Sequence, residues 1–315
     1  MREFDVLEVA DMIDLSSRTR SFIWLGDHDA TLHPIGGKAA QLSRLAGMHR
    51  VPPGFAISAN AFAGNRNPRL SPELRNEIAD SYQQLAIRTG VAEPRVAVRS
   101  SALDEDGPLA SFAGQHETFL NVVGVESVID AVERCLASAT TEQVLAYRNL
   151  HGLATEGIGV AVLVQQLVLS DVSAVLFSAN PISGKRDEMI LTASWGLGES
   201  IVGGTVSPDT WVIDAASQDI VVARLGSKQR MTIAIPGGTR EVEVPRMLRE
   251  QPSLSEDQIR EVARLGRRLE AALGWPVDIE VAFAAGELFL LQCRPITTLG
   301  HVANAGEGGQ YEPAA

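Results

Sequence analysis

A mixed α+β fold with two subdomains is the architecture that the sequence predicts, and three observations support it. Strand-like and helix-like segments alternate along the chain, but without the strict strand–helix–strand period of a parallel sheet. The chain has 315 residues, which exceeds the common size of a single domain. Hydrophobic residues make up 45% of it and charged residues 21%, a composition that can bury a sizeable core.

We divide the chain into four segments. Residues 1–34 form a polar lead-in that contains a short apolar strand, Phe22 to Leu25. Residues 35–160 and 161–300 form the first and second subdomains, and we expect a ligand cleft between them. Residues 301–315 are rich in Gly, Asn, Pro and Ala and form a flexible tail.

The elements of the first half follow from periodicity and from helix stops. Ile35-Gly36-Gly37-Lys38 opens a helix, because apolar residues recur after it at helical spacing, and Pro52-Pro53-Gly54 ends that segment. Further along the chain we expect strands at 55–57, 95–99 and 117–123 and helices at 73–88 and 126–147.

The second half begins with a nearly continuous apolar strand at 157–169, which has the pattern of a buried strand. Shorter strands follow at 175–177 and 189–193. An amphipathic helix runs from Ser255, its N-cap, to Leu273, and Gly274 stops it. Two strands at 277–284 and 288–292 are joined by the turn Ala285-Gly286-Glu287 and form a hairpin.

Charge and cysteine content exclude several classes of protein. The net charge of -12 argues against a nucleic-acid partner. Cys135 and Cys293 are too few for a disulfide framework or a thiolate metal site. The N-terminus is charged where a signal peptide turns apolar, and no apolar run approaches the ~20 residues that span a bilayer. We therefore expect a cytoplasmic protein without a membrane partner.

The C-terminal hairpin carries the most informative set of polar side chains. With Gly286 at the tip and no bulge, Glu280 lies opposite Gln292 and Asp278 lies opposite Arg294. All four side chains then project from one face, and the other face is core, formed by Ile279, Val281, Leu291 and Cys293. Carboxylate and amide oxygens with a guanidinium suit Mg²⁺ bridged to polyphosphate. A solvated hairpin face with one salt bridge is the alternative.

Three other segments gather polar groups among small residues. Gly36-Gly37-Lys38 offers backbone amides and an ammonium at a helix start, a natural anion site. It is not a P-loop, because the first Gly of that motif is missing and Ala39 replaces its Ser or Thr. Arg99-Ser100-Ser101 leaves a strand into a polar loop, and residues 111–115 form a small-residue stretch. An ordinary helix start and ordinary surface loops are the alternatives for these segments.

Together these segments resemble the ATP-binding domain of the phosphoenolpyruvate synthase, pyruvate phosphate dikinase and rifamycin phosphotransferase family. The resemblance covers residues 35–297. Its motifs occur in the order GGKA, VPPGF, VAVRSSALDED, SFAGQHETFLNV, VLFSANPISG, SWGLGESIVGGTVSPD, GSKQRM, DIEVAF and LLQCRPIT. The resemblance implies an ATP-grasp-like fold with a nucleotide cleft, and ATP and Mg²⁺ as ligands.

The resemblance also assigns roles to residues of this chain. Lys38 and Arg99 contact the ATP phosphates, and Arg294 contacts the transferred phosphates; these three are the catalytic candidates. Glu280 and Gln292 are the metal ligands, with Asp278 supporting them. The remaining implied contacts are the adenine hinge, Val164-Gln165-Gln166-Leu167, and Glu199 at the ribose end.

The sequence departs from the family pattern in several places. Ser173-Ala174 stands where the family has Ser-Gly, His116 stands where relatives have Gln or Tyr, and the segment between Phe62 and Arg95 is shorter than in phosphoenolpyruvate synthase. The mobile domain of the family, which carries the catalytic histidine, has no counterpart. We therefore expect a phosphohistidine swivelling domain to act on this chain, in cis or in trans.

The function implied by the resemblance is that of a Mg·ATP-binding module in a dikinase-type phosphotransferase. Such a module passes the β,γ-phosphoryl portion of ATP to a histidine on another domain or protein and releases AMP. Two alternatives remain open: a component of an ATP-dependent ligase or condensing enzyme in natural-product biosynthesis, and a non-catalytic ATP sensor. A sensor needs adenine contacts more than a metal cradle, so the retained phosphate and metal candidates speak against it.

Overall fold

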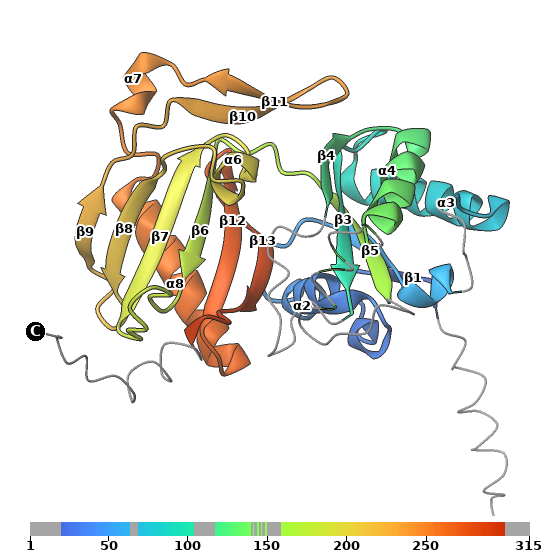
Figure 1. The fold of residues 1–315 in the computed structure, drawn as a ribbon, viewed down its shortest axis with the longest axis horizontal. Coiled ribbons are helices and arrows are strands. Elements are labelled where there is room, and N and C mark those ends of the chain that lie inside the picture. The colour runs from blue at the N-terminus through green and yellow to red at the C-terminus, as the bar shows by residue number, and fades with distance from the viewer. Residues whose placement is uncertain are drawn as a thin grey trace, which may run out of the picture.

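Two antiparallel sheets form the framework of the protein and lie on either side of α2 (Gly36–Leu45) (Figure 1). The computed structural model describes residues 20–63, 69–103, 117–139 and 159–299, together with Thr141, Val144, Ala146 and Asn149. The alternation of strands and helices gives the α+β class that the sequence predicts.

The first sheet has five strands in the order β1-β2-β5-β3-β4. Their bounds are Phe22–Trp24 (β1), Gly54–Ile57 (β2), Val96–Ala102 (β3), Thr118–Val122 (β4) and Val160–Gln166 (β5). α3 (Pro72–Thr89) and α4 (Val125–Ser138) pack on one face and share a buried apolar cluster with β2, β3 and β5. Short 3-10 turns lie at Ala30–Leu32 (η1) and Ala59–Phe62 (η2).

The second sheet has six strands in the order β13-β12-β6-β7-β8-β9. Their bounds are Val172–Phe177 (β6), Glu188–Trp195 (β7), Asp209–Asp214 (β8), Ile220–Arg224 (β9), Val277–Ala284 (β12) and Glu287–Pro295 (β13). α8 (Glu256–Leu273) covers one face of this sheet, and Gly266 lets it approach Leu176 closely. Ser255 caps α8 in a capping box with Gln258, and Gly274 ends it in the left-handed conformation, as the sequence predicts.

A long excursion between β9 and α8 adds elements that the sequence analysis did not predict. It holds a two-stranded hairpin, β10 (Arg230–Ile235) and β11 (Gly238–Glu243), and a short helix, α7 (Arg246–Arg249). In Figure 1 the hairpin extends from above the second sheet toward the first sheet. Another short helix, α6 (Glu199–Val202), lies beneath it.

The helix α2 is buried against both sheets. It contacts β3 and β5 of the first sheet and β13 of the second. One buried apolar cluster joins Leu42 of α2 to Leu176, Leu191 and Ile279 of the second sheet and to Leu265 of α8. This shared core fixes the start of α2 between the sheets, where the Gly-Gly-Lys segment lies.

The sheets do not divide at the predicted subdomain boundary of residue 160. β5 begins there, but it pairs with β2 and β3, so the chain leaves the first sheet only after Gln166. β1, placed in the predicted lead-in of residues 1–34, is the edge strand of the first sheet. The subdomains as folding units stay a prediction.

The described residues leave three further expectations open. α4 ends at Ser138, and most of the predicted helical segment beyond it lies outside the described residues, as do the segment 111–115 and the tail at 301–315. None of the described helices has the length and apolar character that crossing a membrane requires.

Candidate functional site

A cavity of about 320 Å³ lies between the two sheets. From the side of the first sheet it is lined by α2, β3, β4 and the segment that follows β5. From the other side it is lined by β6, α6 and the β12–β13 hairpin. The predicted site residues among its lining are Lys38, Arg99, Leu167, Glu199, Glu280, Gln292 and Arg294. Asp278, Gln165 and Gln166 do not line it.

The hairpin has the predicted pairing at the residues that matter for the site. Glu280 lies opposite Gln292 and Asp278 opposite Arg294. The turn at its tip is shorter than expected, because only Ala285 and Gly286 lie between the paired residues, both with positive φ. The register near the tip is therefore displaced by one residue, and a bulge beside Glu280 restores the predicted register.

This bulge corrects the prediction for Leu291. Strand alternation predicts Leu291 on the core face, but in the structure Leu291 lines the cavity. Leu290 is buried in the core instead. The extra residue reverses the alternation locally, because side chains on a strand point to opposite faces in turn.

Arg294 and Asp278 form an ion pair at the end of the hairpin. Nε of Arg294 donates to Oδ2 of Asp278 at 2.8 Å. The side chain of Asp278 is 7% exposed and that of Arg294 is 34% exposed, and of the two residues only Arg294 lines the cavity. Burial raises the pKa of Asp278 above its usual value, and the adjacent Arg294 opposes that shift. Asp278 therefore orients Arg294; that it supports the metal ligands, as the resemblance implies, stays a prediction.

Glu280 and Gln292 present the oxygen atoms of the site. They lie side by side on the paired strands and both line the cavity. Gln292 is buried, whereas Glu280 is half-buried. The described residues contain no group of three or more His, Cys, Asp or Glu placed to hold a metal. One carboxylate and one amide oxygen are a donor set that suits Mg²⁺, which completes its shell with phosphate and water oxygens.

Arg99 has a buried polar atom without a partner among the described residues. Its Nη1 donates to the carbonyl of Leu291 at 3.3 Å, so the bulge of the hairpin holds the guanidinium in place. Its Nε is buried and has no hydrogen-bond partner within the described part of the chain. Buried guanidinium nitrogens are almost always satisfied, so this one requires an acceptor that the described residues do not supply.

Lys38 reaches the cavity because the start of α2 rests on the end of β3. Gly36 has a φ of +76°, and a Cβ there would lie 2.2 Å from the carbonyl oxygen of Ser101. Oγ of Ser101 accepts from the amide of Ala39 at 3.3 Å and so caps the helix from a distant strand. The glycine is thus required for close approach, and the sequence analysis did not assign this capping role to Ser101.

Gln165 and Gln166 of the predicted hinge lie outside the cavity lining, and their contact with adenine stays a prediction. β5 is an inner strand, paired on both sides with β2 and β3. Nε2 of Gln165 donates to the carbonyl of Pro52 at 3.1 Å, and the amide of Gln166 donates to Pro53 at 2.9 Å. These bonds occupy the side-chain amide of Gln165 and the backbone amide of Gln166. Leu167, the last residue of the predicted hinge, does line the cavity.

Glu199 lines the cavity from the first turn of α6. Its Oε2 accepts a hydrogen bond from Oγ1 of Thr239, which belongs to β11, at 2.9 Å. The neighbouring lining is apolar and includes Leu197, Ile201 and Val202. Thr239 was missed because the segment that carries it was not predicted to form strands, and no role was predicted for these apolar residues.

Curated proteins with similar sequences are considerably longer than this chain. Phosphoenolpyruvate synthase of Pyrococcus furiosus is 42% identical over 78% of the chain and 31% of its own length. A probable phosphoenolpyruvate synthase of Methanocaldococcus jannaschii is 37% identical over 84% of the chain and 25% of its own length. Rifampicin phosphotransferase of Streptomyces sviceus is 38% identical over 84% of the chain and 34% of its own length. The chain therefore spans about a quarter to a third of these relatives.

Comparison with solved structures adds a weaker likeness. An acetyl-coenzyme A synthetase of Ca. Korarchaeum cryptofilum aligns with 90% of this chain and 97% of its own, at a TM-score of 0.40 and 11% identity. D-alanyl-alanine synthetase A of Vibrio cholerae aligns with 84% of this chain and 59% of its own, at a TM-score of 0.33 and 12% identity. TM-scores this low do not establish a shared fold.

A family model provides the firmer assignment. The model described as pyruvate phosphate dikinase, AMP/ATP-binding domain, matches residues 66–312, a range that includes Arg99, Glu199 and the whole β12–β13 hairpin. This chain belongs to the pyruvate phosphate dikinase AMP/ATP-binding domain family.

Proposed function

We propose that this chain is the Mg·ATP-binding module of a dikinase-type phosphotransferase. In this proposal it directs the β,γ-phosphoryl portion of ATP to a histidine on another domain or protein, and AMP is released. The observation that carries the proposal is the convergence of three cationic side chains and the Glu280–Gln292 pair on one cavity. Membership of an AMP/ATP-binding family supports ATP as the ligand.

The cationic side chains have the chemistry that phosphate oxygens require. Lys38, Arg99 and Arg294 come from three separate elements and line the same cavity. Arginine grips phosphate through its planar fork, whereas lysine acts as a point charge. The buried Nε of Arg99 would acquire the acceptor that the described residues lack. Charge spread over the phosphoryl oxygens in the transition state would be stabilised by these groups.

Glu280 and Gln292 are the proposed metal ligands. A carboxylate oxygen and an amide oxygen are hard donors, and Mg²⁺ bound by few protein ligands keeps positions for phosphate and water. The metal would neutralise phosphate charge and hold the phosphates for transfer. Asp278 would act on the site only through Arg294, because it is buried and paired with that residue.

The nucleoside would lie against the apolar part of the cavity. Leu167 and Val168 line it from the segment after β5, and Leu197 and Ile201 line it from the opposite side. Glu199 stands beside these apolar residues, and a carboxylate in that place can accept hydrogen bonds from sugar hydroxyls. We therefore propose that the adenine contacts begin at Leu167 and that Glu199 contacts the ribose.

The proposed acceptor histidine comes from outside this cavity. No histidine is among the described residues that line it. In-line transfer requires a nucleophile placed against the scissile bond, and positioning supplies much of the rate. The longer relatives are named as phosphoenolpyruvate synthases and a rifampicin phosphotransferase, names that support a phosphotransferase system. A histidine-bearing domain, in cis or in trans, is the proposed partner.

Labelled ATP tests this proposal. The chain is incubated with Mg²⁺, ATP labelled in its β-phosphate, and a histidine-bearing domain of a related phosphoenolpyruvate synthase. We expect AMP together with an acid-labile label on the added domain, and neither product with a variant of that domain that lacks its histidine. Label on this chain, or rapid AMP formation without the added domain, would contradict the proposal. ATP binding without any turnover would favour a sensor.

A further inference from the structure

The β10–β11 hairpin connects the second sheet to the first across the nucleotide cavity. In Figure 1 it starts above the second sheet and points toward β4. Residues of β11 and β10 contact β4, and β10 also contacts α6 and β7. The hairpin is held at its base, at its tip and along its length by separate sets of contacts, and one of these sets ends at a residue of the cavity.

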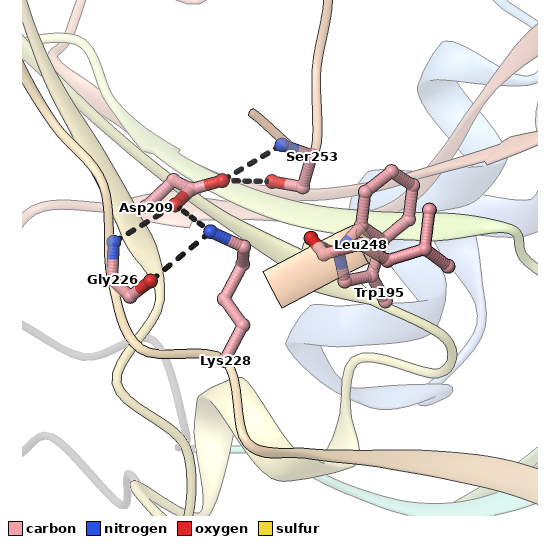
Figure 2. A network of polar contacts seen from close by, with 6 residues as sticks. All are labelled: Trp195, Asp209, Gly226, Lys228, Leu248 and Ser253. Atoms are coloured by element: carbon pink, nitrogen blue, oxygen red, sulfur yellow. Dashed lines mark hydrogen bonds and ion pairs between the residues drawn. The ribbon is translucent and has the colours of Figure 1, made fainter. Parts of the chain in front are cut away.

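The base of the hairpin is held by a buried ion pair, shown in Figure 2. Asp209, the first residue of β8, and Lys228, which leads into β10, are both fully buried and are bonded to each other. Oδ1 of Asp209 also accepts from the amide of Gly226 at 2.9 Å, and Nζ of Lys228 donates to the carbonyl of Gly226 at 3.1 Å. These contacts unite the segments GSKQRM and SWGLGESIVGGTVSPD, to which the sequence analysis gave no structural role.

The return of the chain from the hairpin is fixed to the same carboxylate. Oδ2 of Asp209 accepts from the amide of Ser253 at 2.7 Å and from its Oγ at 2.8 Å (Figure 2). Nε1 of Trp195 donates to the carbonyl of Leu248 at 3.0 Å, close by. Asp209 thus holds both the entry to the hairpin and its exit, so the hairpin leaves the second sheet in a defined direction.

The tip of the hairpin is held by Asn121 of β4. Its Nδ2 donates to the carbonyls of Ile235 and Gly238, at 2.5 and 2.6 Å, and its Oδ1 accepts from Arg95 at 2.6 Å. Asn121 is buried and has a positive φ of 58°. A buried amide with both ends bonded fixes the tip on the first sheet.

The middle of the hairpin touches the lining of the cavity. The carbonyl of Thr232 on β10 accepts from the amide of Leu197 at 2.9 Å. A Cβ on Gly196 would lie 2.4 Å from that same carbonyl oxygen, so a glycine is required there. On the neighbouring strand β11, Oγ1 of Thr239 donates to Oε2 of Glu199 at 2.9 Å. Leu197 and Glu199 line the cavity, whereas Thr239 does not.

We propose that Thr239 is a positioning residue for recognition of the nucleotide sugar, held in place by a hairpin fixed at Asp209 and at Asn121. Thr239 binds one carboxylate oxygen of Glu199 and leaves the other directed to the ribose hydroxyls. This inference rests on the proposed function, since it assumes a nucleotide in the cavity. It adds a residue outside the cavity that determines how strongly the protein prefers a full ribose over a deoxyribose.

A second threonine of the same region provides a matched control. Oγ1 of Thr205 donates to Oε1 of Glu241, another carboxylate, at 2.7 Å. This bond also ties the segment after α6 to β11. Neither Thr205 nor Glu241 lines the cavity. Loss of the Thr205 bond therefore weakens the attachment of the hairpin without touching Glu199.

The test is a set of calorimetric titrations with Mg·ATP, Mg·2′-deoxy-ATP and Mg·3′-deoxy-ATP. The wild type should bind ATP more tightly than at least one deoxy analogue. Thr239→Val removes the hydroxyl at nearly constant shape and should weaken ATP binding roughly three- to tenfold, the range for the loss of one ordinary hydrogen bond. Binding of that deoxy analogue should weaken less, so the preference for the full ribose shrinks. Thr239→Ser should restore the preference, and Thr205→Val should leave it unchanged.

The other possible outcomes contradict either this inference or the proposed function. If Thr239→Val weakens ATP and the deoxy analogues equally, Thr239 has only a structural role and the inference is wrong. An unchanged affinity in Thr239→Val, or a wild type that binds all three nucleotides equally, overturns it as well. Failure of the wild type to bind any Mg-nucleotide instead contradicts the proposed function.

Discussion

The second half of the chain holds two aspartate–cation pairs that differ in what surrounds them. Asp209 and Lys228 are both 0% exposed, and Asp209 accepts from donors on Gly226, Lys228 and Ser253. Asp278 is 7% exposed, but its partner Arg294 is 34% exposed and lines the cavity. The first pair is closed to ligands, whereas the second reaches the space where we propose the phosphates bind.

The difference shows that burial and complete hydrogen bonding distinguish an ion pair that holds the fold from one that can contact a ligand. A buried ion pair is tolerated when its remaining hydrogen-bonding groups are satisfied, and removal of one partner leaves an uncompensated charge. The Asp209–Lys228 pair meets this condition within the protein and fixes a hairpin. Arg294 lines the cavity, where we propose that it contacts a bound phosphate. Four predictions test this contrast.

The largest expected effect is on stability. Lys228→Met leaves Asp209 buried without its cation, and breaking such a pair costs about 3–5 kcal/mol. Urea unfolding followed by circular dichroism measures the free energy of unfolding. Lys185→Met serves as control, because Lys185 pairs with Glu188 at the exposed surface and should contribute little. Equal stability of the two variants would show that the buried pair is not an anchor.

The second prediction concerns the metal and the hairpin face. Glu280→Gln should keep the fold, since Glu280 is half-buried and faces the cavity, but should remove the increase in ATP affinity caused by Mg²⁺. Titration with ATP in Mg²⁺ and in EDTA measures that increase. Glu287→Gln is the matched control in the same hairpin, because Glu287 pairs with Arg50 and lies outside the cavity lining. If Glu280→Gln retains the full magnesium effect, Glu280 is not a metal ligand.

The third prediction separates charge from geometry at Arg99. Arg99→Lys keeps the charge but loses both the fork and the Nε that lacks a partner, so AMP formation with an added histidine domain should fall more than tenfold. ATP affinity should fall only a few-fold. Arg88→Lys, at a residue stacked on Trp24 away from the cavity, is the control. Full turnover in Arg99→Lys would mean that Arg99 supplies only positive charge.

The smallest effect concerns the ionisation of Asp278. Burial raises its pKa in the folded state, so the folded protein binds this proton more tightly than the unfolded chain. The resulting stabilisation is full below the unfolded pKa of 3.8 and is lost as the pH rises through the folded pKa. The stability of the wild type relative to Asp278→Asn should therefore fall as the pH rises above 3.8. The opposite trend in urea unfolding would mean that attraction to Arg294 outweighs burial.

Local patterns in the sequence predicted much of the fold and the pairing of the hairpin residues that line the cavity. The pairing of Glu280 with Gln292 followed from strand periodicity and a short turn. The bulge at Leu291 did not, because it depends on the turn length and on the contact of Leu291 with Arg99, 192 residues away in sequence. Nothing in the sequence around Gln165 indicates that β5 pairs with a strand on each side.

The contacts of the segment between β9 and α8 could not be predicted from the sequence, for a different reason. β9 and β11 have few buried residues, so they lack the apolar alternation that marks a half-buried strand. Asp209 and Lys228 were part of quoted motifs, but their pairing depends on how the chain returns from β9. Thr239 and Glu199 are 40 residues apart and meet only because the hairpin is fixed at both ends.

The measurement that most directly tests the account is calorimetric titration of ATP into the wild-type chain, in Mg²⁺ and in EDTA. We expect saturable binding with one nucleotide per chain and higher affinity in Mg²⁺. A melting temperature raised by Mg·ATP should accompany it, since ligand at a hundred times its dissociation constant adds about 2.7 kcal/mol of stability. Absence of binding in both buffers, or affinity that magnesium leaves unchanged, would contradict a Mg·ATP site formed by Lys38, Arg99, Arg294 and the Glu280–Gln292 pair.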